Sequence, residues 1–130
     1  MENMPAFTLH RPETAAEAVK LKATDATSRY LAGGTDMIVN VRRGIEAPET
    51  MIDLTAIAAI TEIAADGDGM RIGAGVKLSD LAAHEEIRRA YPAVAQAAAS
   101  VAGPTHRQYG TIGGNLCLDT RCLFYNQSQW

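Results

Sequence analysis

Two glycine pairs in this chain are followed by residues with hydrogen-bonding side chains. In the first, Gly33 and Gly34 lack a Cβ and can adopt positive φ, so their backbone amides can converge on an anion. Thr35 and Asp36 follow and begin a predicted helix, whose first turn carries free N–H groups and the positive end of the helix dipole. The pattern predicts a diphosphate site with the Thr35 hydroxyl as a further donor. The alternative is a plain strand-to-helix turn in which Thr35 or Asp36 merely caps the helix.

A second glycine pair repeats this pattern in the run GTIGGN. Gly113 and Gly114 precede Asn115, which can donate hydrogen bonds from its side chain or take a left-handed backbone conformation. A single glycine turn is weak support for a ligand site. Two such turns, each with a donor side chain beside the glycine pair, favour two walls of one phosphate-bearing ligand site. A pair of unrelated tight turns is the alternative.

Cys117 and Cys122 form a C-x4-C pair soon after the second glycine pair. Iron–sulfur clusters are bound by cysteine thiolates, usually four for each cluster. The chain has 2 cysteines, so it cannot complete such a site alone. Arg121 would favour the thiolate form that a metal requires. Ordinary reduced thiols are the alternative, whereas a structural disulfide is disfavoured in the cytoplasm.

Local signals predict the elements that would position the first glycine pair. Thr14 and Glu17 fit a capping box, in which the side chain of each residue bonds to the other's backbone amide. Gly44 is suited to end the helix that follows the glycine pair. The elements expected in this half are a strand at residues 7–9, a helix at 13–23, a strand at 29–32 and a helix at 36–43.

The second half of the chain mixes expected strands and helices. Strands are predicted at residues 50–54 and 60–65, a tight turn followed by a further strand within 67–76, and helices at 78–91 and 93–102. Ser79 or Asp80 would cap the first of these helices, and Pro92 would stop it. From Thr105 onward no convincing periodicity is present. This order predicts an α+β fold of two small subdomains, at residues 1–57 and 58–130.

The composition excludes several classes of function. Charged residues make up 21% and hydrophobic residues 47% of the chain, as in ordinary globular proteins, so disorder is not expected. The net charge of −3 argues against nucleic acid as a partner, because phosphate backbones attract clustered Lys and Arg. Neither a signal peptide nor a bilayer-spanning apolar run is visible, which predicts a cytoplasmic protein without a membrane partner. GAGVKL at residues 73–78 lacks the last glycine of a Rossmann fingerprint.

Four segments of the chain match a known pattern in order and spacing: LAGGTDMIVNVRRG, IDLTAI, GAGVKLSDL and GPTHRQYGTIGGNL. Together they resemble the FAD-binding medium subunit of the molybdenum hydroxylase (xanthine dehydrogenase) family. The resemblance implies a truncated FAD-binding fold of the vanillyl-alcohol oxidase-like (PCMH) type. It also implies that two loops embrace the FAD pyrophosphate and neighbouring groups. The residues implied are Leu31, Ala32, Gly33, Gly34, Thr35, Asp36, Thr111, Ile112, Gly113, Gly114 and Asn115.

The final segment, NLCLDTRCLFYNQSQW, looks most like the β subunit of 4-hydroxybenzoyl-CoA reductase within that family. This likeness implies an insertion that binds a [4Fe–4S] cluster. Cys122 would be its first ligand and Cys117 a buried or spare thiol. The remaining ligands would lie beyond Trp130, so the chain is expected to be an N-terminal fragment of the subunit.

The resemblance implies an oxidoreductase subunit that transfers electrons through FAD. Its implied partners are a large subunit with the molybdenum cofactor, a small [2Fe–2S] subunit, and an external electron carrier, either ferredoxin or NAD. In the reductase, electrons would run toward molybdenum and remove a phenolic hydroxyl from an aromatic CoA thioester. The alternatives are the FAD subunit of a xanthine, aldehyde or CO dehydrogenase-type hydroxylase, a non-redox module for another phosphate ligand, and a structural piece that scaffolds partner subunits.

Overall fold

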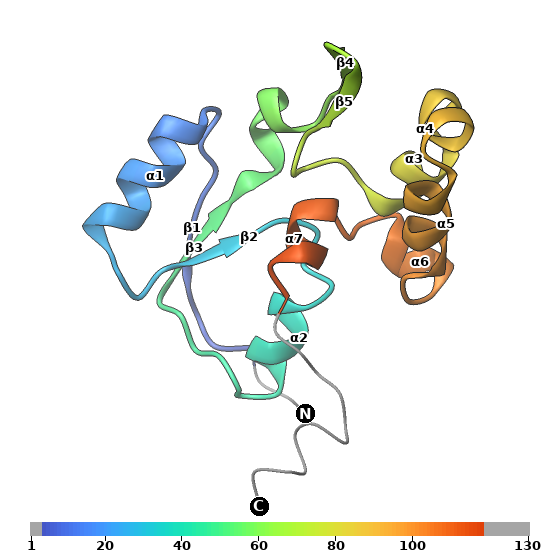
Figure 1. Cartoon of the computed structure of the whole chain (residues 1–130). Coiled ribbons are helices and arrows are strands. Elements are labelled where there is room, and N and C mark those ends of the chain that lie inside the picture. The colour runs from blue at the N-terminus through green and yellow to red at the C-terminus, as the bar shows by residue number, and fades with distance from the viewer. Residues whose placement is uncertain (1–3, 119–130) are drawn as a thin grey trace, which may run out of the picture.

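The first half of the chain contains a three-stranded parallel sheet (Figure 1). The computed structural model describes residues 4–118. Strands β1 (Thr8–His10), β2 (Arg29–Leu31) and β3 (Thr50–Asp53) pair in the order β1-β3-β2. Met51 and Ile52 of the central strand are fully buried. The predicted strand at residues 50–54 is therefore confirmed as the centre of this sheet.

Helix α1 (Ala15–Thr24) connects β1 to β2 and begins at the predicted capping box. The Glu17 amide donates to Thr14 Oγ1 at 3.2 Å, and the Glu13 amide donates to Glu17 Oε2 at 3.2 Å. The carboxylate thus bonds one residue earlier than the usual capping box requires. Ala18 is buried and belongs to the same apolar cluster as Ile52 of the sheet. The prediction of a capped helix at residues 13–23 is confirmed.

Helix α2 (Met37–Arg42) follows β2 and the first glycine pair. Gly44 lies just beyond it with a φ of 71° and donates its amide to the carbonyl oxygen of Val41 at 3.0 Å. A left-handed residue at this place is a common way to end a helix, because its amide satisfies an open carbonyl. The expected helix ended by Gly44 is therefore confirmed.

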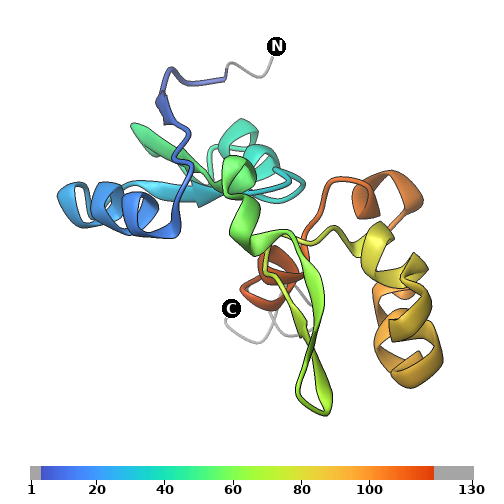
Figure 2. The ribbon, with the colours of Figure 1, turned by 90° about the horizontal axis from the view of Figure 1, so that it is seen from above.

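A hairpin projects from the middle of the chain, away from both the sheet and the later helices (Figure 2). It consists of β4 (Ile63–Asp66) and β5 (Gly69–Ile72), with Gly67 at the turn and a φ of 58°. Two short 3-10 helices, η1 (Leu54–Ala56) and η2 (Ala58–Ile60), precede it. The strand expected at residues 60–65 begins later, because the Thr61 amide closes the second 3-10 turn by bonding to the Ala58 carbonyl.

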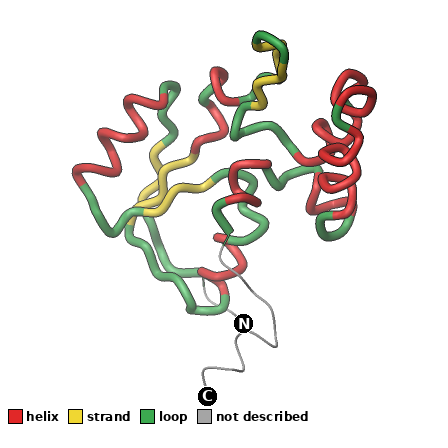
Figure 3. Tube along the Cα trace, viewed as in Figure 1, coloured by secondary structure: helices red, strands yellow, loops and turns green. Residues whose placement is uncertain are grey.

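Helices dominate the rest of the described chain, as Figure 3 shows by colour. They are α3 (Leu78–Ala83), α4 (Glu85–Ala90), α5 (Pro92–Ser100), α6 (Pro104–Arg107) and α7 (Ile112–Leu116). The single helix predicted at residues 78–91 is wrong, since His84 is extended and separates α3 from α4. The ring of His84 accepts a hydrogen bond from the Ile87 amide at 3.4 Å and so caps α4. Among residues 4–118, no helix has the length and apolarity needed to cross a membrane.

The buried apolar residues form two clusters, one on each side of the chain's midpoint. Ala18, Ile52 and Ile57 belong to the first. The second lies among α3, α4 and α5 and contains Val76, Leu78, Leu81, Ile87, Ala95 and Ala98. The stretch between these clusters contains the predicted subdomain boundary at residues 57 and 58, which stays a prediction. In both Figure 1 and Figure 2, α7 lies between the sheet and the α3–α6 helices.

We expect Thr14→Ala to lower the free energy of unfolding by about 1 kcal/mol, because the N-terminal amides of α1 lose their side-chain acceptor. Urea denaturation followed by circular dichroism measures this. Thr105 is a suitable control, since its exposed hydroxyl makes no hydrogen bond to the described residues. Thr105→Ala should change stability by less than about 0.5 kcal/mol. Equal losses in the two variants would contradict the capping role of Thr14.

Candidate functional site

The first glycine pair lies in the loop between β2 and α2. Gly34 has a φ of 73°, in the left-handed region that favours glycine. The backbone amides of Gly33, Gly34 and Thr35 donate no hydrogen bond to any described residue, and the Thr35 hydroxyl makes none either. All three residues are half-buried. This loop therefore presents backbone and hydroxyl donors whose hydrogen bonds are open to water or to a ligand.

Asp36 occupies the N-cap position of α2, but its side chain makes no capping hydrogen bond. Its Oδ2 instead accepts a hydrogen bond from Nδ2 of Asn40 at 3.1 Å, one helical turn further along. Asn40 is only 6% exposed, and its Oδ1 has no hydrogen-bond partner among the described residues. Neither Thr35 nor Asp36 therefore caps α2 through its side chain, and the plain strand-to-helix turn stays an alternative. Asn40 lies within the segment LAGGTDMIVNVRRG, but nothing in that pattern singled it out, so its contact with Asp36 could be found only from the structure.

The second glycine pair forms part of α7 rather than an open turn. Thr111 is the N-cap, and its Oγ1 accepts a hydrogen bond from the Gly114 amide at 3.1 Å. Neither Gly113 nor Gly114 has a positive φ. The prediction of a second glycine turn was wrong, because the largely buried Thr111 starts a short helix that includes Asn115.

Other amides of the second loop already have acceptors within the protein. The Ile112 amide donates to the Val76 carbonyl oxygen at 2.9 Å, and the Gly113 amide donates to that of Ala74 at 2.8 Å. A Cβ on Gly113 would lie 2.7 Å from the Cβ of Ala74, so glycine permits this close approach. The groups left for a ligand on this side include the Thr111 hydroxyl hydrogen and the Asn115 side chain, which makes no hydrogen bond to the described residues.

The structure brings the two loops into direct contact. A Cβ added to Gly33 would collide with the Tyr109 carbonyl oxygen and lie 2.9 Å from the Gly110 amide nitrogen. A Cβ on Gly110 would in turn lie 3.5 Å from Oγ1 of Thr35. The first loop therefore lies on the backbone that leads into Thr111. The unrelated-turns alternative does not fit this packing.

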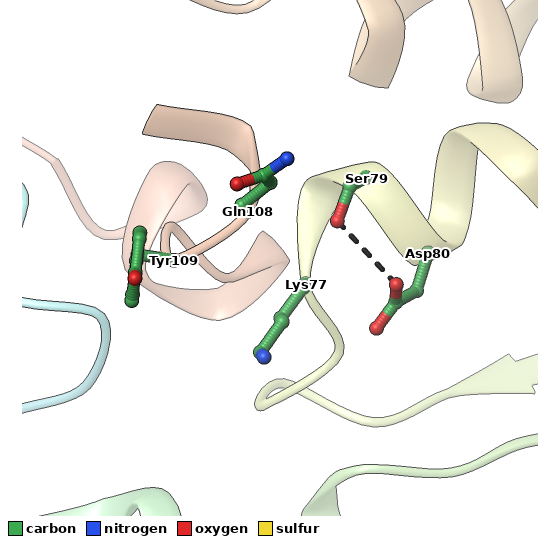
Figure 4. A pocket seen from close by; sticks show the side chains of 5 residues that line it. All are labelled: Lys77, Ser79, Asp80, Gln108 and Tyr109. Carbon is green, nitrogen blue, oxygen red and sulfur yellow. Dashed lines mark hydrogen bonds between the residues drawn. The ribbon is translucent and has the colours of Figure 1, made fainter. Parts of the chain in front are cut away.

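An open hollow of about 460 Å³ adjoins the second loop (Figure 4). Lys77 and Thr111 pair across an isolated antiparallel bridge, which joins one edge of the hollow to that loop. The side chains drawn in Figure 4 come from the start of α3 and from the segment after α6. All of them lie within two of the segments that carry the family resemblance, but the sequence analysis placed none of them in the ligand site. They are Lys77, Ser79, Asp80, Gln108 and Tyr109.

Comparison with known protein families shows to which family this chain belongs. The model of the FAD binding domain in molybdopterin dehydrogenase matches residues 5–122. The chain belongs to this family. The expected kinship with FAD-binding subunits of the molybdenum hydroxylase type is confirmed at this level, and both glycine loops lie within the matched segment.

Curated relatives of this FAD-binding family extend over nearly the same segment. The aldehyde oxidoreductase FAD-binding subunit PaoB of Escherichia coli K12 is 37% identical over 97% of this chain and 40% of its own length. The xanthine dehydrogenase FAD-binding subunit of Escherichia coli O157:H7 is 34% identical over 83% of this chain and 37% of its own. The chain thus spans about 40% of the length of the curated relatives it matches.

Solved structures show the same fold. A carbon monoxide dehydrogenase from Hydrogenophaga pseudoflava matches with a TM-score of 0.85 and 31% identity, over 88% of this chain and 40% of that chain. The quinoline 2-oxidoreductase of Pseudomonas putida 86 matches with a TM-score of 0.84 and 25% identity, over the same shares of the two chains. The FAD-binding PCMH-type fold with mixed helices and strands is therefore confirmed.

The structure describes Cys117 but not Cys122, so it bears on one of the two cysteine predictions. Cys117 lies at the C-terminal end of α7 as an exposed free thiol, so the buried form of its predicted role is wrong and the spare-thiol form fits. Cys122, the predicted first cluster ligand, lies outside the described residues. Within residues 4–118, no group of three or more His, Cys, Asp or Glu side chains could hold a metal ion.

We expect Gly33→Ala to lower the free energy of unfolding of the cofactor-free protein by about 1–3 kcal/mol, because the added methyl group overlaps the Tyr109 carbonyl and forces the backbones apart. Gly69→Ala is the matched control. A Cβ at Gly69 would meet its nearest neighbours at 3.7 and 3.9 Å, which is ordinary contact. Chemical denaturation of both variants without FAD tests this. A Gly33→Ala protein as stable as Gly69→Ala would contradict the loop contact.

Proposed function

We propose that this chain binds FAD and forms part of the FAD-binding subunit of a molybdenum-containing oxidoreductase. The observation that carries the proposal is the first loop, in which the amides of Gly33, Gly34 and Thr35 have no acceptor among the described residues. Membership of an FAD-binding family supports the choice of ligand. The whole subunit's activity and partners are inferred, since the chain covers about 40% of its relatives.

The donors of the first loop fit a pyrophosphate. Phosphate oxygens accept hydrogen bonds from several backbone amides at once, and a residue with positive φ such as Gly34 lets successive amides form a concave anion site. The Thr35 hydroxyl adds a donor without adding charge. Two negative charges repel at short range, so the Asp36 carboxylate would face a hydroxyl group of the cofactor and not its phosphates. Its bond to Asn40 holds it along α2.

The second loop would act through side chains. Thr111 uses its hydroxyl oxygen to cap α7 and retains its hydrogen for donation. Asn115 lies within the same helix and offers both a donor and an acceptor. Leu31, Ala32, Ile112, Gly113 and Gly114 complete the proposed site and shape the backbone around it.

FAD would supply one- and two-electron transfer between redox partners, and the protein would bind and orient it. The relatives are named for aldehyde, xanthine and carbon monoxide oxidation. We therefore favour a hydroxylase-type complex with a molybdenum large subunit and a [2Fe–2S] small subunit. The assignment to 4-hydroxybenzoyl-CoA reductase, the [4Fe–4S] cluster at Cys122 and the carrier, ferredoxin or NAD, stay predictions. So do the cytoplasmic location and the two subdomains.

FAD binding is tested directly by titrating the purified protein with FAD and following the quenching of flavin fluorescence. We expect saturable uptake of FAD, and weaker binding of riboflavin, which lacks the pyrophosphate. ADP should compete with FAD for the same donors. No uptake of FAD would refute the proposed function, and tighter binding of ADP than of FAD would favour the non-redox phosphate-binding module.

The Thr35 hydroxyl is tested by two substitutions. Thr35→Val removes the hydroxyl but keeps the shape, and we expect the FAD dissociation constant to rise about tenfold, as for loss of a hydrogen bond to a charged group. Thr35→Ser keeps the hydroxyl and should bind FAD within about twofold of the parent protein. Equal affinities of the Val and Ser variants would remove Thr35 from the site.

A further inference from the structure

Arg107, the last residue of α6, closes the turn between α5 and α6. Its Nη1 donates hydrogen bonds to the carbonyl oxygens of Val101 at 2.9 Å and Ala102 at 2.7 Å. The side chain is half-buried. A guanidinium group is well suited to this contact. Its planar geometry is fixed in advance, so the side chain loses little conformational entropy for each hydrogen bond that it forms. One side chain therefore holds two successive carbonyls of the turn.

The turn that Arg107 holds is strained. Ala102 has a φ of 47° and is the one non-glycine residue with positive φ in the described range. In this region the Cβ approaches the backbone too closely, so an alanine adopts it only when its surroundings require it. The two hydrogen bonds from Arg107 go to the carbonyl of this residue and to that of the residue before it.

The same short helix connects this turn to the two glycine loops. Helix α6 has 4 residues. At its end the carbonyl oxygen of His106 accepts hydrogen bonds from the amides of Tyr109 at 3.2 Å and Gly110 at 2.7 Å. The Tyr109 carbonyl is the group against which Gly33 packs. A shift of the α5–α6 turn would therefore move the backbone on which the first loop lies.

We propose that Arg107 is a positioning residue for the FAD site. It acts through the backbone, because both of its hydrogen bonds go to carbonyls of the α5–α6 turn. By fixing the strained turn at one end of α6, it sets the position of Tyr109 and Gly110 at the other end. These residues then hold the first loop and its donors. The inference rests on the proposed FAD function.

The test is a double-mutant cycle on the purified protein, with FAD affinity from fluorescence titration well below the unfolding temperature. Arg107→Gln should raise the FAD dissociation constant by about tenfold, as for loss of hydrogen bonds to a charged donor. Ala102→Gly should leave it within about twofold, because glycine adopts positive φ freely. In the double variant the turn no longer needs Arg107, so affinity should recover to within about threefold of the parent.

Two further variants separate positioning from other roles. Arg88→Gln removes the same charge from an exposed arginine of α4 and should leave FAD affinity unchanged. Arg107→Lys keeps the charge but loses the planar fork, so its affinity should be reduced. Full affinity in Arg107→Lys, with no recovery in the double variant, would overturn the inference in favour of a direct charge contact with FAD.

The outcomes also separate this inference from the function on which it rests. If the parent protein binds FAD and Arg107→Gln binds it equally well, the role of Arg107 is refuted while FAD binding stands. If Arg107→Gln only lowers the thermal midpoint and leaves affinity unchanged, its role is structural and the inference is refuted. A parent protein without FAD uptake refutes both. Visible circular dichroism of the bound flavin gives a second readout, and we expect it to change in Arg107→Gln and to return in the double variant.

Discussion

The missing side chain of Gly33 is the constraint on which the arrangement of the site depends. Because no Cβ intervenes, the loop after β2 lies directly on the carbonyl group of Tyr109. The Leu78 amide donates to the Gly110 carbonyl oxygen at 2.9 Å and holds the same backbone from its other side. Three segments that are far apart in the sequence therefore meet within a few residues. Any larger residue at position 33 would separate the sheet from the segment that begins α7.

The two glycine loops look alike in the sequence but differ in what they offer a ligand. The amides of Gly33, Gly34 and Thr35 have no acceptor among the described residues. The amides of Ile112 and Gly113 instead donate to the carbonyls of Val76 and Ala74, between β5 and α3. Under the proposed function, the first loop would give a phosphate several backbone donors, while the second would form a wall and contribute side chains. This division of labour lets one loop remain available for binding without leaving the whole region short of internal hydrogen bonds.

Local signals in the sequence predicted much of the fold and less of the site. The capping box at Thr14 and the central strand were predictable, because a cap and an apolar run depend on neighbouring residues. The break at His84 was not, since a histidine that caps a helix looks like any exposed polar residue. Helix α7 was missed because a glycine pair lowers helix propensity, whereas the Thr111 cap and the distant contact with Ala74 favour it in the fold. The bond between Asn40 and Asp36 needed coordinates.

The order of the strands has a consequence for how the chain reaches its native state. Strands β1 and β2 are not neighbours, and within residues 4–118 each of them pairs only with β3, which comes last of the three along the chain. A ribosome must therefore release the segment up to Asp53 before either earlier strand has a partner. Until then α1 has no complete sheet to cover. Assembly of this half should accordingly occur in one late, cooperative step and not strand by strand.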